Sequence, residues 1–327
     1  MTNKAAKAVA VLGPTATGKT ALGVALARAL DGEVVSADSR QVYRGLDIGS
    51  GKDLTEYAAG GPPVRHHLVD VAAPEEVYDL ARFKADATAA LADIAARGKL
   101  PLLVGGSALY LDCLLSGYAL PGRAPDPELR ARLRGLDAAG LAAELAAASP
   151  DALASVQEPG CRPRLIRALE NAAVPPAPAL DGSGRNFEWL ALGVYFPRAE
   201  VHRRIEARLD ARLAAGLLEE VQALHDAGLS WERLDSFGLE YRHVSLHLRG
   251  ELGLAAMRDK LLAKIRRLAR SQDIWFRKME REGRDIHWVE RGDPARALAL
   301  AADFLAGRTL PRPELRLADI HYGPKSS

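Results

Sequence analysis

The sequence predicts an α/β fold in which a P-loop parallel sheet is covered by helices and carries a mainly helical insertion. Short apolar runs alternate with segments of helical spacing, and a glycine-rich turn follows the first run, which together predict the sheet. The lack of a strand pattern over 118–185 predicts the insertion. We therefore expect a core formed by 1–117 and 186–312, the helical insertion 118–185, and a disordered tail over 313–327.

The composition excludes several classes of protein. The 327 residues include 44 basic and 42 acidic ones, so the net charge is +2 and attraction to nucleic acid must come from local clusters. Cys113 and Cys161 are too few for a disulfide framework. No apolar segment approaches the roughly 20 residues of a membrane span, and the N-terminus lacks the apolar core of a secretory signal. We expect a cytoplasmic protein without membrane contact, and a monomer.

A phosphate-binding loop follows the first apolar run, 8–12, and precedes leucines at helical spacing. Its members are Gly13, Pro14, Thr15, Ala16, Thr17, Gly18, Lys19 and Thr20. The two glycines free the backbone, so that successive N–H groups and the next helix N-terminus point at anionic oxygens. Lys19 would reach the terminal phosphates and the Thr20 hydroxyl would hold Mg²⁺. The alternative is a plain turn that links a strand to a helix.

A second strand over 32–37 ends on the polar segment Asp38, Ser39, Arg40 and Gln41. The carboxyl ends of parallel strands line one crevice, so this segment and the P-loop are expected to face the same cleft. From its position Asp38 is equally suited to binding Mg²⁺, to acting as a base, or to capping the next helix.

The following segments supply a loop, a strand and a helix. Residues 44–63 contain many glycines and prolines and predict a loop over the cleft, and 66–70 predicts a short strand. Adjacent strand residues point to opposite faces, so His66 and His67 are not expected to share a metal. Helical spacing over 80–95 ends at a glycine.

The strand 100–104 leads into the tight turn Gly105, Gly106 and Ser107. The glycines permit close approach of the backbone to a ligand, and Ser107 would stand at a helix N-terminus as a ligand contact or as a plain N-cap. Nucleotide-hydrolysing P-loop proteins usually carry an acidic residue at such a strand end, and its absence here argues against a kinase.

Arginines cluster in the second half of the chain. Within the insertion, Arg164 and Arg167 share a helix face. A strand over 187–196 returns to the sheet, and apolar spacing predicts one long helix over 201–224. Near its start Arg204 and Arg208 would clamp a diphosphate or would simply be solvated.

A late helix carries basic residues with interleaved aromatics, which are Lys264, Arg266, Arg267, Arg270, Trp275, Phe276, Arg277 and Lys278. This combination suits contact with a nucleic-acid backbone and stacking on bases. The alternative is that the two aromatics belong to the core and the charges form a solvated face.

Seven stretches of this sequence together resemble the tRNA dimethylallyltransferase family. In family order they are 13–20, 36–43, 47–49, 66–70, 103–107, 164–170 and 275–277. The sequence departs from the family pattern at 49–53, at Ala108, at 238–242 and within 265–271.

The resemblance implies a P-loop core that binds dimethylallyl diphosphate with Mg²⁺ and passes the dimethylallyl group to the exocyclic amine of the adenosine next to the tRNA anticodon. It implies that Asp38 is the catalytic base and that Ser107 touches the base or the diphosphate, with Lys19 at the leaving group. The implied tRNA contacts are Asp38, Ser39, Arg40, Gln41, Ser107, Pro163, Arg164, Leu165, Ile166, Arg167 and Arg270. Three rivals stay open: a P-loop kinase, prenyl transfer to free adenine nucleotides, and a non-catalytic RNA-binding protein.

Overall fold

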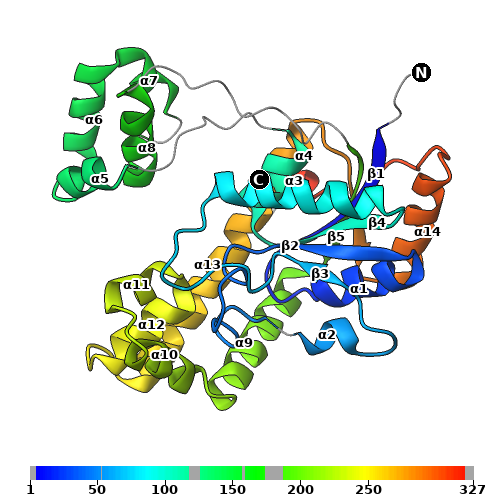
Figure 1. Ribbon diagram of the computed structural model, residues 1–327, viewed down its shortest axis with the longest axis horizontal. Helices are drawn as coiled ribbons and strands as arrows, with labels where there is room; N and C mark the ends of the chain where they lie inside the picture. The colour runs from blue at the N-terminus through cyan, green and yellow to red at the C-terminus, as the bar shows by residue number, and fades with distance from the viewer. Residues whose placement is uncertain (1–4, 53, 118–125, 157–158, 174–186, 321–327) are drawn as a thin grey trace, which may run out of the picture. The chain divides into compact units, whose positions relative to one another are not determined.

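The computed structural model describes residues 5–52, 54–117, 126–156, 159–173 and 187–320 (Figure 1). The chain divides into two compact units, one formed by Met1–Ser116 with Gly184–Ser327 and the other by Gly117–Ser183. Each unit is described by itself.

The first unit is built on a six-stranded sheet with the order β3-β2-β4-β1-β5-β6, in which every pairing is parallel. The strands are β1 (Ala6–Leu12), β2 (Gly32–Ala37), β3 (His66–His67), β4 (Leu100–Gly105), β5 (Phe187–Tyr195) and β6 (Ile286–Glu290). The inner strands read as continuous apolar runs because helices cover both faces of a parallel sheet. The predicted α/β class is confirmed.

The register brings three loops together at one edge of the sheet. Leu12, the last residue of β1, is paired with Gly105 of β4, and Gly105 is also paired with Ala37 of β2. The P-loop, the segment after β2 and the Gly-Gly-Ser turn therefore leave the sheet side by side, which is where open α/β sheets bind their ligands.

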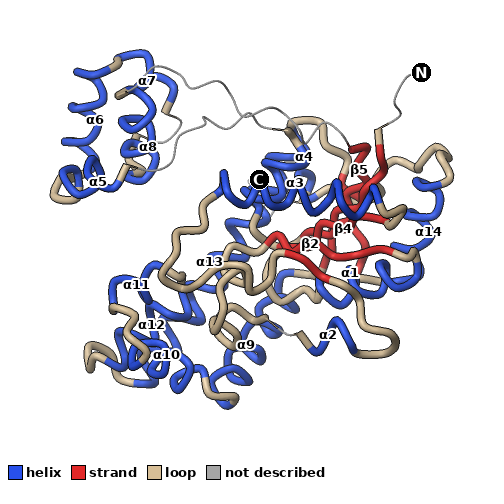
Figure 2. The backbone as a smooth tube through the Cα atoms, viewed as in Figure 1, coloured by secondary structure: helices blue, strands red, loops and turns tan. Residues whose placement is uncertain are grey.

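Helices cover the sheet on both faces (Figures 1 and 2). One face carries α3 (Leu80–Ala96) and α4 (Ala108–Leu115), and the other carries α1 (Lys19–Ala29) with α14 (Pro294–Leu305) beside it. A short helix, α2 (Thr55–Ala58), interrupts the predicted loop over 44–63.

A second group of helices packs beside the sheet. It comprises α9 (Arg198–Ala214), α10 (Leu217–Asp226), α11 (Trp231–Ser236), α12 (Leu239–Leu248) and the 28-residue α13 (Leu254–Arg281). The single long helix expected over 201–224 is wrong. Gly216 has φ 101°, a left-handed conformation that starts α10 on a new axis, although the apolar spacing continues across the break.

The predicted strand over 66–70 is also too long. Only His66 and His67 pair with β2, because Leu68 and Asp70 adopt positive φ angles of 61° and 57° and turn the chain away. His67 Nε2 contacts the Glu33 carboxylate at 2.8 Å, which gives this histidine a structural partner. Among the described residues no three His, Cys, Asp or Glu side chains gather as a metal site.

The second unit is helical throughout its described residues. Its helices are α5 (Pro127–Leu133), α6 (Ala138–Ala148), α7 (Pro150–Ser155) and α8 (Arg162–Ala172). Leu133, Leu141, Leu145, Leu165 and Leu169 form its small core. The N-caps Asp126, Asp137 and Ser149 each accept a hydrogen bond from a first-turn N–H, so the helix starts are locally encoded.

The expected disorder over 313–327 is wrong for its first part. The 3₁₀ turn Leu317–Asp319 packs on α13 and buries Leu317. The Glu280 carboxylate, itself buried, accepts hydrogen bonds from the backbone N–H groups of Leu317 and Ala318 and from Trp288 Nε1. Residues 321–327 lie outside the described residues. Along the described chain, no helix has both the length and the apolar character that crossing a bilayer would need.

Candidate active site

One cavity of about 530 Å³ lies at the sheet edge where the three loops meet. Among its lining residues are the predicted site residues Thr15, Lys19, Thr20, Asp38, Ser39, Arg40, Gln41, Ser107 and Arg208. Ala16, Gly18 and Arg204 line an adjoining cavity that shares Lys19, Thr20 and Arg208 with the first. The structure thus gathers the diphosphate-binding and base-binding predictions in one place.

The P-loop is held in an anion-binding shape by its own backbone and side chains. Gly13, Ala16 and Gly18 have φ angles of 149°, 64° and 79°, which turn the loop so that α1 begins at Lys19. Thr17 Oγ1 and Lys19 Nζ both donate to the Pro14 carbonyl, at 2.9 and 2.6 Å. Successive backbone N–H groups in such a turn, followed by a helix N-terminus, form a cradle for phosphate oxygens.

Cations surround this loop. In the described chain neither Lys19 nor Arg208 forms an ion pair with a carboxylate. Desolvation, and then the charge of Arg208, lowers the pKa of Lys19 to about 8, although Asp38 and Glu56 oppose the shift. Desolvation, and then Arg212, lowers the pKa of Arg208 to about 10. An anionic ligand would relieve this repulsion.

Three arginines one helical turn apart on α9 face the P-loop side of the cavity. Arg204 Nε donates to the Ala16 carbonyl at 2.7 Å, Arg208 donates to the Gly51 carbonyl at 3.3 Å, and Arg212 donates to the Gly49 carbonyl at 3.3 Å. Arg212 also pairs with Glu240 at 3.2 Å. Sequence reasoning found Arg204 and Arg208 but missed Arg212, which the same four-residue spacing could have revealed.

Asp38 uses one carboxylate oxygen to hold its own turn. Asp38 Oδ1 accepts hydrogen bonds from the backbone N–H groups of Arg40 at 2.9 Å and Gln41 at 3.4 Å. No described helix starts directly after Asp38, so Asp38 does not act as a helix N-cap. The turn fixes the carboxyl group at the cavity wall.

Ser107 joins two strand ends. Its hydroxyl oxygen accepts a hydrogen bond from the Ser39 backbone N–H at 3.1 Å, and it makes no capping hydrogen bond to α4. Ser107 therefore occupies the N-cap position of α4, as the alternative had it, but its side chain does not cap the helix. Gln41 extends the same network, because its Nε2 donates to the Gly51 carbonyl at 3.3 Å. The segment after β2 is thus tied to both β4 and the loop at 47–52.

The loop at 47–52 is held by Glu220, a residue that sequence reasoning missed. The Glu220 carboxylate accepts hydrogen bonds from the backbone N–H groups of Asp47, Ile48 and Gly49, at 3.0, 2.6 and 3.0 Å. The Tyr241 hydroxyl donates to the same carboxylate at 2.8 Å. No local sequence signal marks Glu220, because the backbone N–H groups that it binds lie more than 170 positions away.

The helix α13 forms another wall of the cavity through Leu268, Ser271, Gln272 and Trp275. Trp275 Nε1 donates to Asp112 Oδ2 of α4 at 3.0 Å, whereas Phe276 is completely buried in the core. The core alternative therefore holds for Phe276. Gln272 contacts both the P-loop and the Gly-Gly-Ser turn, a role that the basic pattern of this helix does not suggest.

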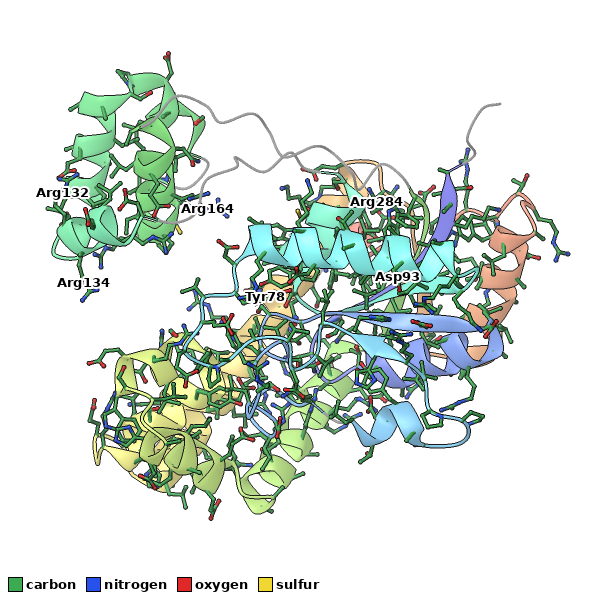
Figure 3. The ribbon with its side chains drawn as sticks, viewed as in Figure 1. Tyr78, Asp93, Arg132, Arg134, Arg164 and Arg284 are labelled. Carbon is green, nitrogen blue, oxygen red and sulfur yellow. The ribbon has the colours of Figure 1, made fainter. Side chains whose placement is uncertain are left out.

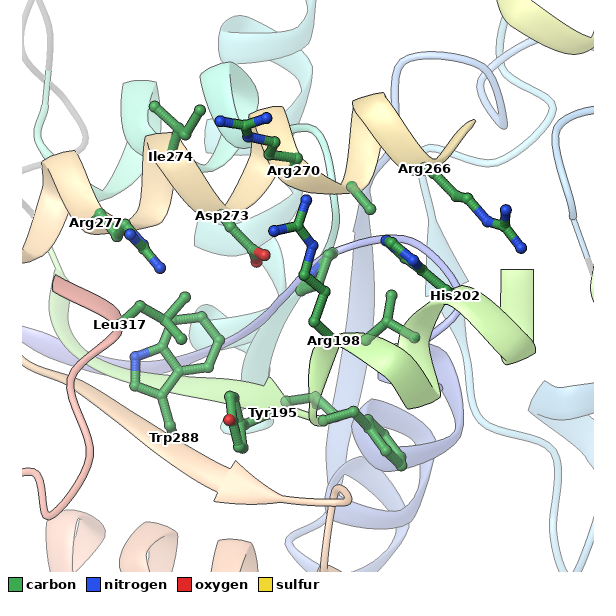
Figure 4. A pocket seen from close by; sticks show the side chains of 15 residues that line it. Tyr195, Arg198, His202, Arg266, Arg270, Asp273, Ile274, Arg277, Trp288 and Leu317 are labelled. Atoms are coloured by element: carbon green, nitrogen blue, oxygen red, sulfur yellow. The ribbon is translucent and has the colours of Figure 1, made fainter. Parts of the chain in front are cut away.

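The opposite face of α13 lines a different, smaller cavity of about 150 Å³ (Figure 4). Arg270 lies here and not in the P-loop cavity. Asp273 and Arg198 extend toward each other in this view. Desolvation raises the pKa of Asp273 to about 6, although Arg277 and Arg198 oppose the shift.

The remaining predicted tRNA contacts belong to α8 of the helical unit. Pro163 and Arg164 are exposed, Ile166 is half-buried, and Leu165 is buried in the unit's own core. Arg167 pairs with the buried Glu170 at 2.9 Å, as does Arg130 of α5 at 2.6 Å. Figure 3 shows Arg164 and, on the same unit, Arg132 and Arg134.

Comparison with known proteins shows the family to which this chain belongs. The family model described as IPP transferase matches residues 41–279. The chain is 49% identical to tRNA dimethylallyltransferase 2 of Syntrophotalea carbinolica over 294 residues, which is 88% of this chain and 96% of that protein. The chain belongs to the IPP transferase family, which the tRNA dimethylallyltransferases represent.

Solved structures agree with the family assignment. The crystal structure of a full-length tRNA isopentenylpyrophosphate transferase from Bacillus halodurans is 32% identical and has a TM-score of 0.66, covering 92% of this chain and 96% of its own. A eukaryotic dimethylallyltransferase studied with tRNA shares the fold at a TM-score of 0.77 and 24% identity, covering 94% of this chain and 81% of its own.

Proposed function

We propose that this family member transfers a dimethylallyl group from dimethylallyl diphosphate to the exocyclic amine of the adenosine next to the anticodon of tRNA, releasing diphosphate. One observation carries the proposal: a phosphate-binding loop ringed by cations shares a cavity with the carboxyl group of Asp38. Such a cavity provides for a leaving diphosphate at one end and for a proton acceptor at the other.

The P-loop end stabilises the leaving group. As the allylic C–O bond breaks, negative charge builds on the departing diphosphate, and fixed N–H dipoles placed there lower the barrier. Lys19 and Arg208 add positive charge at the same place, and Arg204 holds the loop through the Ala16 carbonyl. These groups cost no reorganisation during the reaction because the protein already orients them.

The residues present are compatible with Mg²⁺. This ion is commonly held by one or two protein groups together with substrate phosphates. The Thr20 hydroxyl lines the cavity beside Lys19 and would supply a protein ligand. Bound there, Mg²⁺ would offset the charge of the diphosphate.

Asp38 is the proposed proton acceptor. The adenine amine nitrogen forms the new N–C bond, the allylic C–O bond breaks, and the amine proton passes to the Asp38 carboxylate. The hydrogen bonds from the Arg40 and Gln41 N–H groups hold this carboxylate in place. General-base catalysis of this kind contributes typically about 10²- to 10⁴-fold in rate.

Access for the adenine requires a base that has left its stack, which costs a few kcal/mol and is easier in a loop than in a duplex. Trp275 is half-buried at the cavity wall and offers aromatic surface to an extruded base. We assign tRNA contacts to Ser39, Arg40, Gln41 and Ser107 in the cavity. Further tRNA contacts are proposed for Arg270 and for the segment Pro163, Arg164, Leu165, Ile166 and Arg167. We propose that the enzyme acts in the cytoplasm. It would act as a monomer, because one chain carries every group used here.

The test is incubation of labelled dimethylallyl diphosphate with unmodified tRNA, with AMP, and with ATP plus small acceptors in parallel. We expect label in the tRNA alone. Label in AMP would favour prenyl transfer to free nucleotides, and transfer of the γ-phosphate of ATP without tRNA would favour a kinase. A tRNA that carries guanosine at the acceptor position is the matched control and should take up no label.

A further inference from the structure

The side chain of Gln272 joins two loops that come from different strands. Gln272 Oε1 accepts a hydrogen bond from the Thr15 backbone N–H at 2.9 Å, and Gln272 Nε2 donates to the Gly106 carbonyl at 2.7 Å. Thr15 belongs to the P-loop after β1, and Gly106 belongs to the turn after β4. These two partners fix the orientation of the Gln272 side-chain amide. The Thr15 N–H is a donor and needs the amide oxygen, whereas the Gly106 carbonyl is an acceptor and needs the amide NH₂ group.

The surroundings of Gln272 are shaped for this bridge. Gly106 lacks a side chain where one would crowd the amide, because a Cβ at this position would lie 3.0 Å from Gln272 Nε2. The bridge comes from α13, which is itself tied to α4 by the hydrogen bond between Trp275 and Asp112. Gln272 thus acts from a helix that is fixed against the turn it contacts.

The bridge continues into the base-binding end of the cavity. Ser107 follows Gly106 directly, and its hydroxyl receives the Ser39 N–H at 3.1 Å, next to Asp38. A displacement of the Gly106 carbonyl would therefore move Ser107 and the segment that carries Asp38. A displacement of Thr15 would move the P-loop that holds the leaving group.

We propose that Gln272 is a positioning residue that sets the separation between the diphosphate-binding loop and the Asp38–Ser107 end of the cavity. This assignment rests on the proposed function. Transfer between two bound substrates depends on their relative placement, and a misplacement of about 1 Å can cost about 10²-fold in rate. Within the described part of the chain, both hydrogen bonds of the side chain go to backbone groups, so it acts through the two loops.

The experiment compares Gln272→Ala and Gln272→Glu with the unchanged chain. Gln222→Ala is the matched control, because Gln222 lines neither the P-loop cavity nor the cavity beside it and its side chain donates to Asp226 on its own helix. We expect both Gln272 variants to lower kcat by about 10- to 100-fold while the KM for each substrate changes less than about threefold. Glutamate keeps an acceptor for Thr15 but loses the donor to Gly106, so it should fail as alanine does.

Two results would overturn this assignment: kcat unchanged in Gln272→Ala, or a loss confined to the KM for tRNA, which would make Gln272 an RNA contact. Amide hydrogen exchange at Thr15 gives a readout that does not depend on catalysis. Exchange at Thr15 should accelerate in Gln272→Ala and stay unchanged in Gln222→Ala. Equal exchange in the unchanged chain, in Gln272→Ala and in Gln222→Ala would refute the bridge. If the unchanged chain modified no tRNA, the proposed function would fail while this exchange measurement would still decide the bridge.

Discussion

Arginines of α9 and arginines of the helical unit look alike in the sequence but have different partners in the structure. Arg204 and Arg208 of α9 donate to backbone carbonyls, which are neutral, so their positive charge remains available beside the P-loop. Arg130 and Arg167 instead share the buried carboxylate of Glu170. The number of arginines in a segment therefore does not by itself indicate an anion site. What distinguishes Arg204 and Arg208 is that, among the described residues, neither forms an ion pair with a carboxylate.

The largest effect is expected from removing the charge on α9. Arg208→Ala should lower kcat by about 10²- to 10³-fold, because it deletes a preorganised cation where the diphosphate charge develops. Steady-state kinetics with dimethylallyl diphosphate and unmodified tRNA measures this loss. Arg132→Ala, which removes an exposed pair with Glu144, is the control and should leave kcat unchanged. Equal activity of the two variants would remove the distinction between the two groups of arginines.

The second effect concerns stability and belongs to the helical unit. Glu170→Gln should destabilise this unit by about 1–3 kcal/mol, because Arg130, Arg167 and the Asp126 N–H lose a shared charged acceptor. Amide exchange along α8 in the full chain would report the loss, with Arg132→Ala as the matched change. Unaltered exchange in Glu170→Gln would show that the arginines of this unit are not held by Glu170.

The smallest effect is a pH dependence of diphosphate binding. The pKa of Lys19 is lowered to about 8, so the side chain is mainly protonated at pH 7 and loses its charge as the pH rises above 8. The protonated form binds diphosphate, so the affinity for inorganic diphosphate should fall by up to about tenfold for each unit of pH above that value. Lys19→Arg keeps its charge and should flatten the profile. A fall of equal size in both chains would assign the titration to another group.

The residues whose shared cavity could be predicted from the sequence have one property in common. Asp38, Ser107 and the P-loop that carries Lys19 each come after a buried apolar strand, and a parallel sheet gathers the ends of such strands at one edge. The residues that were missed, Glu220 and Gln272, reach the site from helices that lie far away in sequence. Apart from the Tyr241 hydroxyl that donates to Glu220, their partners are backbone groups, which carry no residue-type signal, so no motif could indicate them.

The errors in element boundaries have a similar origin. Apolar spacing runs through Gly216 without interruption, and only its left-handed conformation divides the helix into α9 and α10. The segment 313–320 looks like a polar tail with prolines, but Glu280 on α13 binds its backbone N–H groups and Leu317 fills a place in the core. In both cases a local pattern was overruled by a contact or conformation that the pattern does not encode.

The most direct test of the account separates chemistry from binding at Asp38. Single-turnover transfer of labelled dimethylallyl to unmodified tRNA should be about 10²- to 10⁴-fold slower in Asp38→Asn, while the tRNA dissociation constant stays within about threefold of that of the unchanged chain. This outcome would place the proton acceptor opposite the P-loop. Undiminished transfer, or a slow rate explained fully by weaker tRNA binding, would contradict the claim that one cavity holds both the leaving group and the base.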